Sequence, residues 1–198
     1  MIIPFDGLAA AVFFAVAACW IGFGVVFLTG KAAGARTNRQ RDFKSMLGMA
    51  VQGVGYAIVF IMTRARYTAL LPMPKWAEGL LGMLAIAIAV VSVGFSFVAV
   101  RTLGKQWALV ARVTEGHELI TRGPYAVVRN PIYLAMLGML LATGVAISRW
   151  QAIAVAVIIF LLGTAIRVRT EENLLRGTFR EAFEDYTRRV PALFPKIF

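Results

Sequence analysis

Uncharged stretches long enough to cross a lipid bilayer recur along the chain, and short basic segments separate them. In the N-terminal half they cover residues 7–30, 45–63 and 79–100, and in the C-terminal half residues 130–148 and 150–166. About 20 residues of helix span a hydrocarbon core of about 30 Å, because each residue rises by about 1.5 Å. The pattern therefore predicts an all-α integral membrane protein with about five transmembrane helices.

The last two stretches are separated only by Arg149, which predicts a helical hairpin. The first of them opens with Asn130-Pro131. Proline is favoured in the first turn of a helix, so we expect this helix to begin near Pro131. Within residues 45–63, small residues such as Gly53 and Gly55 would let helices approach closely, and Gln52 would form a hydrogen bond between helices.

The tail of the chain has a different pattern. Apolar residues recur there every three or four positions, with arginines between them: Leu175, Phe179, Phe183, Tyr186 and Val190. This spacing predicts an amphipathic C-terminal helix over residues 170–190. Such a helix would lie against the membrane interface or the cytoplasmic face of the protein.

Basic residues are concentrated in alternate connecting segments. Lys and Arg total 17 in residues 31–44, 101–129 and 167–196, against 4 in residues 64–78 and at position 149. Cytoplasmic loops of membrane proteins carry the excess of Lys and Arg, so we expect the N-terminus outside and the C-terminus in the cytoplasm. The net charge of +11 then indicates membrane lipids as partners, through their anionic headgroups, and no nucleic acid.

Composition supports this assignment, with 60% hydrophobic and only 16% charged residues and a mean hydropathy of +0.75. These values are typical of integral membrane proteins, and the length favours a single domain over residues 1–198. Residues 1–100 would supply three spans, and residues 101–198 would form the ligand-binding half. The compact, Ala- and Gly-rich chain is typical of a prokaryotic protein, which predicts the inner (plasma) membrane as its location.

Residues 117–133 form a polar, turn-rich segment between apolar stretches, and they include the only histidine, His117. Two prolines, one glycine, two tyrosines and two arginines lie within these seventeen residues. So specific a set predicts a ligand site at the membrane surface. We expect no metal there, because one His, one Cys and scattered carboxylates do not make a zinc site. The sequence also lacks a Walker A motif and a Rossmann glycine fingerprint after a predicted strand.

Several short motifs follow one another through the second half of the chain. In order they are Leu103-Gly104 with Trp107, His117-x-Leu119-Ile120-Thr121-x-Gly123-Pro124-Tyr125, Arg129-Asn130-Pro131-x-Tyr133, Glu171-Glu172 with Leu174 and Leu175, then Phe179, Tyr186 and Leu193-Phe194-Pro195. In these motifs the chain resembles the isoprenylcysteine carboxyl methyltransferase family, which is related to membrane phospholipid methyltransferases. The resemblance covers residues 103–195, about half of the chain.

The resemblance implies an enzyme that transfers a methyl group from S-adenosylmethionine to a lipophilic acceptor, such as the carboxylate of an isoprenylcysteine. The cofactor would enter from the cytoplasm and the acceptor from the bilayer. The residues carried over as cofactor-binding are His117, Leu119, Gly123, Tyr125, Arg129, Asn130, Pro131, Tyr133, Glu171 and Glu172. Among them, Arg129, Tyr133 and Glu172 are the predicted catalytic residues.

The chemistry of these side chains agrees with that cofactor. Glu171 or Glu172 can pair with its ammonium group, and Arg129 with a carboxylate of the cofactor or acceptor. Tyr125 or Tyr133 can face the sulfonium through a cation–π contact. An acceptor carboxylate is already ionised at neutral pH and needs no general base. The shortage of candidate bases therefore favours a carboxylate acceptor over an amine.

One position departs from the family pattern, because the family motif Arg-His-Pro reads Arg129-Asn130-Pro131 here. A neutral amide bonds more weakly than a charged donor, by about 1 kcal/mol, so cofactor affinity would fall by roughly tenfold. This departure motivates a competing hypothesis, a non-catalytic protein that binds lipid or a partner. A phospholipid-amine or small-thiol methyltransferase and a reductase that uses NADPH also compete with the carboxyl methyltransferase. The two adjacent acids argue against a phosphate-bearing cofactor.

Each candidate residue also has a simpler interpretation. His117 could cap a loop against phosphates, and Tyr125 and Tyr133 could be aromatic residues of the membrane interface. At least one of Glu171 and Glu172 could neutralise Arg167 or Arg169 within one helix. Arg112, Arg122 and the arginines of the tail would contact lipid headgroups.

Overall fold

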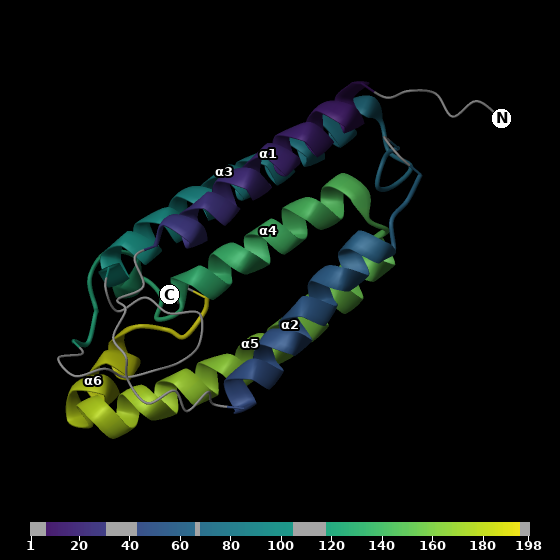
Figure 1. Ribbon diagram of the computed structural model, residues 1–198. Helices are drawn as coiled ribbons and strands as arrows, with labels where there is room; N and C mark the ends of the chain where they lie inside the picture. The colour runs from purple at the N-terminus through teal and green to yellow at the C-terminus, as the bar shows by residue number, and fades with distance from the viewer. Residues whose placement is uncertain (1–6, 31–42, 66–67, 105–117, 195–198) are drawn as a thin grey trace.

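The computed structural model describes residues 7–30, 43–65, 68–104 and 118–194, and these are almost entirely helical (Figure 1). The helices are α1 (Gly7–Thr29), α2 (Phe43–Ile61), α3 (Lys75–Leu103), the 3-10 helix η2 (Gly123–Ala126), α4 (Pro131–Ile147), α5 (Trp150–Phe179) and α6 (Glu181–Arg189). Within the described ranges, the only β-type pairing is an isolated bridge between Thr63 and Ser148.

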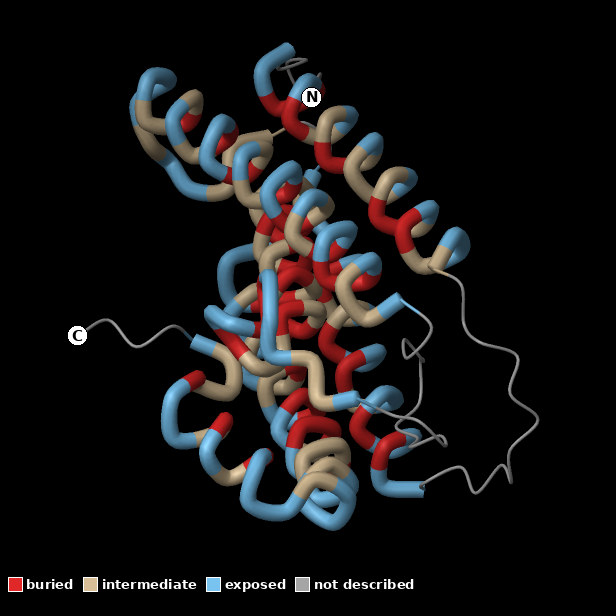
Figure 2. The backbone as a smooth tube through the Cα atoms, turned by 90° about the vertical axis from the view of Figure 1, so that its left-hand side faces the viewer, coloured by how far each residue is buried: buried red, intermediate tan, exposed pale blue. Residues whose placement is uncertain are grey.

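The long helices form two pairs with α4 between them. Helices α1 and α3 lie side by side, as do α2 and α5, and α4 runs between the pairs (Figure 1). One buried cluster joins α1, α3 and α4, with Val16, Ala89 and Met139 at its centre. A second joins α2, α4 and α5 through Leu140 and Phe160. Buried positions face these clusters, whereas the outer faces of the helices are exposed (Figure 2).

Four helices, α1, α2, α3 and α5, are long and apolar enough to cross a membrane. Helix α4 is apolar but shorter, at 17 residues. The outer faces carry large apolar side chains, such as Ile21 and Leu28, the latter 85% exposed. An exposed apolar surface of this extent is typical of contact with lipid. The prediction of an all-α integral membrane protein is therefore confirmed, with α4 at the centre as a shorter fifth helix.

The predicted amphipathic C-terminal helix is present as α6, but it begins at Glu181 instead of near residue 170. Helix α5 continues to Phe179, and Arg180 then takes a left-handed conformation, with φ of 46°. The chain reverses at Arg180, so α6 folds back and packs Phe183 and Tyr186 against Leu175 and Phe179 of α5. The apolar positions predicted a helix lying on the membrane interface or on the protein, and they pack against one another so that α6 lies on the protein.

Helix α5 packs more extensively on α2 than on α4, although α4 and α5 are joined directly as the hairpin prediction required. The predicted hydrogen bond of Gln52 is present, because its Nε2 donates to Thr164 Oγ1 of α5 at 2.8 Å. Gly55 lies against this helix as expected, since a Cβ there would meet Ala156 O at 2.9 Å. Gly53 does not, because a Cβ there would meet nothing within 4 Å. Gly163 of α5 makes the close approach instead.

One end of the molecule gathers the ends of the elements that flank the three basic segments. This end contains the ends of α1, α3 and α5, the starts of α2 and α4, and helix α6 (Figure 1). This arrangement agrees with a single basic side. That this side faces the cytoplasm stays a prediction.

At the opposite end, Arg64 caps the C-terminus of α4. Its guanidinium donates to Val145 O at 2.8 Å, Ala146 O at 3.0 Å and Ser148 O at 2.6 Å, and to Thr68 O at 2.8 Å. The last carbonyls of a helix have no partner within it, and a cation there also interacts favourably with the helix dipole. Burial lowers the pKa of Arg64, and the nearby carboxylate of Glu78 opposes that shift.

We expect Arg64→Gln to destabilise the protein by about 2–3 kcal/mol, because several carbonyls lose a charged donor. Thermal unfolding in detergent measures the change. Arg149→Gln is the matched control, since Arg149 lies at the same end and is exposed. Equal unfolding temperatures for Arg64→Gln and the wild type would contradict the capping role.

Candidate active site

The connector between α3 and α4 is described from Glu118 onward and turns at η2. Gly123 opens this turn with φ of 61°, a conformation that favours glycine. The following Pro124 and Tyr125 are buried. The backbone N–H groups of Arg129 and Asn130 then donate to Pro191 O at 2.9 Å and Ala192 O at 3.1 Å. Helix α4 begins at Pro131, as predicted.

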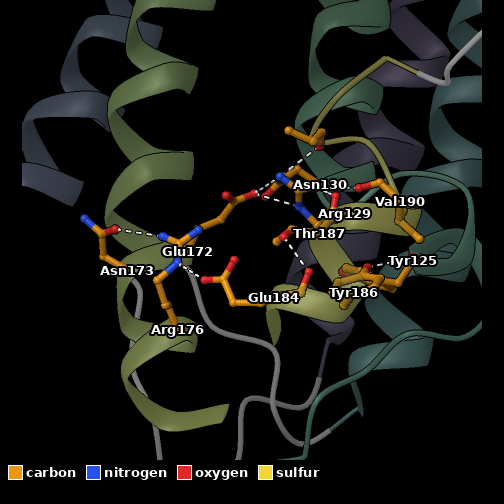
Figure 3. A network of polar contacts seen from close by, with 11 residues as sticks. Tyr125, Arg129, Asn130, Glu172, Asn173, Arg176, Glu184, Tyr186, Thr187 and Val190 are labelled. Carbon is orange, nitrogen blue, oxygen red and sulfur yellow. Dashed lines mark hydrogen bonds and ion pairs between the residues drawn. The ribbon is translucent and has the colours of Figure 1, made fainter. Parts of the chain in front are cut away.

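Arg129 ties the connector to α5 and to the C-terminal segment (Figure 3). Its Nε and Nη2 both lie 2.9 Å from Glu172 Oε1. Its Nη1 donates to Thr187 O at 3.2 Å and to Val190 O. The two side chains are mostly buried, at 12% and 14% exposure. Arg129 therefore holds Glu172 close to the connector, although the two residues are 43 positions apart in the chain.

Asn130 replaces the histidine of the family motif, and its side-chain amide also bonds the C-terminal segment. Asn130 Nδ2 donates to Ala192 O at 2.9 Å, and this bond lies beside the Arg129 contacts in Figure 3. The side chain thus holds the C-terminal segment against the start of α4. The predicted role of Asn130 in cofactor binding stays a prediction.

A second group of polar residues forms around Glu171. The hydroxyl of Tyr133 donates to Glu171 Oε1, and Arg167 Nη2 lies 3.4 Å from the same oxygen. The Arg167 guanidinium also lies 5.0 Å from the centre of the Tyr133 ring, and its Nη1 reaches Gln52 Oε1 at 3.4 Å. The group therefore joins α4 and α5 to α2. The expectation that one acid neutralises an arginine of its own helix is confirmed for Glu171 and Arg167.

Two tyrosines join η2 to α6. Tyr186 Oη donates to Tyr125 O at 2.6 Å. Burial raises the pKa of Tyr186 to about 12; the neighbouring Arg129 lowers it and Glu172 raises it. Burial also raises the pKa of Tyr125, and the neighbouring Tyr186 and Glu171 add to that shift. Both phenols therefore stay protonated at neutral pH, and Tyr186 keeps its role as a donor.

The structure brings together most of the predicted site residues that it describes. Arg129, Tyr133, Glu171 and Glu172 meet across α4 and α5. Leu119 packs against the apolar cluster of α6, and Gly123 lies beside Thr102 of α3. His117 lies outside the described residues, so its predicted role is untested.

Sequence reasoning missed three contributors to this site. Arg167 and Gln52 were interpreted only as a neutralised charge and an interhelical bond, yet both belong to the group around Glu171. The carbonyls of residues 187–192 were missed altogether. A spacing of four residues between Arg167 and Glu171 on one helix was the available signal for the first of these.

The assembled side chains offer two carboxylates, two guanidinium groups and an aromatic ring. Each acid uses Oε1 for the contacts given above, so among the described residues the second oxygen of each can accept a bond from a ligand. The donor set therefore suits a ligand that carries an ammonium, a carboxylate and a second cationic centre.

Comparison with known proteins places this site in a family. A family model described as phospholipid methyltransferase matches residues 80–182, just over half of the chain. The nickel-cobalt-cadmium resistance protein NccN of Alcaligenes xylosoxydans xylosoxydans is 34% identical over 113 residues, 57% of this chain and 53% of the relative. The cobalt-zinc-cadmium resistance protein CzcN of Cupriavidus metallidurans is 34% identical over 107 residues, 54% of this chain and 49% of the relative.

A third relative is the protein-S-isoprenylcysteine O-methyltransferase B of Arabidopsis thaliana. It is 31% identical over 100 residues, 49% of this chain and 50% of the relative. The chain spans about half the length of the curated relatives it matches. The matched family region contains η2, α4, α5 and the four side chains Arg129, Tyr133, Glu171 and Glu172. The chain therefore belongs to the phospholipid methyltransferase family of membrane proteins, to which the isoprenylcysteine carboxyl methyltransferases are related, as its motifs predicted.

Proposed function

We propose that this protein transfers a methyl group from S-adenosylmethionine to the carboxylate of a lipophilic acceptor such as an isoprenylcysteine. The observation that carries the proposal is the meeting of Arg129 with Glu172 and of Tyr133 with Glu171 at one end of the helices. Family membership supports methyl transfer by a membrane protein. The relative from Arabidopsis thaliana supports the carboxylate acceptor.

The side chains present fit this cofactor. When bound, S-adenosylmethionine would supply an electrophilic methyl group on a sulfonium. The second oxygens of Glu171 and Glu172 would hold its ammonium. Arg129 would position Glu172 and offer its remaining Nη2 hydrogen to a carboxylate of the cofactor or acceptor. One face of Tyr133 already meets Arg167, so its other face, or Tyr125, would meet the sulfonium.

The state of the tyrosines supports a carboxylate acceptor. The phenols of Tyr125 and Tyr186 keep their protons at neutral pH, so neither supplies a general base. A carboxylate acceptor needs none, since it is already ionised. Catalysis would then depend on in-line positioning and exclusion of water. The acceptor would enter from the bilayer and the cofactor from the cytoplasm.

Cofactor binding tests the proposal directly. We expect calorimetry on the full chain in detergent to detect binding of S-adenosylmethionine. Glu171→Gln should weaken this binding by about tenfold, because the ammonium of the cofactor loses a charged partner. Glu184→Gln is the matched control. Glu184 also pairs with an arginine, Arg176 of α5, but both side chains are nearly half exposed, and such pairs contribute little.

Absence of binding by the wild type would contradict the proposal. Binding that appeared only in Asn130→His would favour the non-catalytic hypothesis instead. Tracing a labelled methyl group into an isoprenylcysteine, a phosphatidylethanolamine or a small thiol then separates the acceptors. The two bacterial relatives are named for resistance to metals, not for a reaction, and favour none of these acceptors.

A further inference from the structure

An open, shallow cavity of about 520 Å³ lies between the last turns of α3 and the turn at η2. It is lined by Phe97, Val98, Arg101, Thr102, Arg122 and Gly123. The connector approaches α3 closely here, because a Cβ on Gly123 would lie 3.2 Å from Thr102 Oγ1. None of the lining residues belongs to the groups around Glu171 and Glu172, and only Gly123, at the η2 turn, is shared with the predicted site residues.

The charged residues of the lining are both cationic. Arg101 and Arg122 are both exposed, and the Arg101 guanidinium lies over the Phe97 ring, 5.3 Å from its centre. Among the described residues that line the cavity, none is acidic. Two arginines without an acid between them favour an anionic ligand, and their planar groups suit the oxygens of a phosphate.

An apolar strip on α3 leads to this cationic end. Leu84, Val91 and Val98 recur every seven residues and are each about half or more exposed. Met83, Val90 and Phe97 repeat the spacing one position earlier and are also exposed. Residues seven apart lie on one face of a helix, so the strip runs along α3 toward Arg101. Gly94 forms a gap in it, since a Cβ there would meet nothing within 4 Å.

We propose that this surface binds an anionic phospholipid, with its phosphate between Arg101 and Arg122 and an acyl chain along the α3 strip. The charge of the cavity selects a lipid with a net negative headgroup. An acyl chain would cover the exposed apolar strip on α3, whereas a free phosphate would leave it exposed. This site does not depend on the proposed methyl transfer.

Lipid retention measured by native mass spectrometry of the full chain tests this site. We expect the wild type, titrated with phosphatidylglycerol in detergent, to retain this lipid more tightly than phosphatidylcholine. Each interfacial cation contributes about fivefold to binding, so Arg101→Gln with Arg122→Gln should weaken retention of phosphatidylglycerol by about 25-fold. Arg169→Gln is the control, because Arg169 is also an exposed arginine but lies on α5.

A second variant tests the apolar strip without altering charge. Gly94→Phe should lower retention of phosphatidylglycerol severalfold by filling the gap, and it should not lower the unfolding temperature, because a Cβ at this position meets no protein atom within 4 Å. Equal retention of both lipids by the wild type would overturn the proposal. So would a loss in Arg169→Gln as large as in the double variant, or unchanged retention in Gly94→Phe.

Discussion

Replacing Arg129 by alanine is expected to destabilise the protein by about 3 kcal/mol. The change leaves the carboxylate of Glu172, only 14% exposed, without its cation. It also removes the donors to the carbonyls of Thr187 and Val190. Removing one partner of a buried ion pair costs about 3–5 kcal/mol, because the other charge stays buried without compensation. Chemical or thermal unfolding in detergent measures this loss.

The loss should begin at the C-terminal segment, because the Arg129 side chain holds it to the connector. Limited proteolysis should therefore cleave after α6 faster in Arg129→Ala than in the wild type. Arg129→Lys should fall between the two, since an ammonium keeps the charge but cannot reach all three partners. Arg188→Ala is the control: this arginine is 78% exposed and lies 3.8 Å from Asp185. Wild-type unfolding and cleavage in Arg129→Ala would show that the pair does not stabilise this end.

The uncharged stretches predicted where helices lie in the membrane better than where they end. Helices α1 and α2 match their predicted ranges within a few residues, because lipid excludes charge from the whole of a span. Helix α3 passes Arg101, and α5 continues beyond Arg167 and Arg169. A charge marks the edge of the hydrocarbon core, but a helix can extend beyond that edge. The uncharged stretches thus indicated which residues lie within the hydrocarbon core, but they underestimated the lengths of α3 and α5.

The tail shows where periodicity fails. Its apolar residues keep helical spacing on both sides of Arg180, so nothing in the pattern marks a break. Arginine rarely adopts a positive φ. The reversal at Arg180 depends instead on tertiary contacts, the burial of Phe183 and Tyr186 against Leu175. Contacts of this kind form only in the folded chain, so the spacing of apolar residues does not predict them.

The candidate site was predictable in its charged residues and not in its neutral partners. Motif resemblance linked Arg129 and Tyr133 with the acids of α5, and the structure brings these together. The carbonyls that receive Arg129 and Asn130 belong to residues 187–192, where side-chain identity carries no signal for a backbone acceptor. The sequence also did not indicate which acid pairs with which residue, because Glu171 and Glu172 are adjacent. In the structure Glu172 pairs with Arg129 and Glu171 with Tyr133.

The second large effect is expected from Gly163→Ala, at the contact between α2 and α5. A Cβ at this position would lie 2.7 Å from Gln52 N and from Gly48 O, which is closer than side chains pack. Both atoms belong to the backbone of α2, so the helices would have to separate. Overpacking of this kind costs about 1–3 kcal/mol, and we expect the upper part of that range because no flexible side chain can yield. Unfolding in detergent measures the cost.

Separation of these helices should also reach the candidate site. Gln52 bonds Thr164 next to Gly163 and also contacts Arg167, which pairs with Glu171. A shift of α5 would therefore move Glu171 relative to Tyr133, and binding of S-adenosylmethionine should weaken together with stability. The helix contact and the site are then coupled through the buried polar residues that they share.

Gly53→Ala provides the matched control on α2. A Cβ there meets nothing within 4 Å, and alanine favours a helix over glycine by up to about 1 kcal/mol. This variant should unfold no earlier than the wild type and bind the cofactor equally well. The two substitutions add the same methyl group to the same pair of helices, so opposite outcomes would assign the effect to the contact itself. Equal losses in both would mean that glycine is required for reasons other than close packing of α2 on α5.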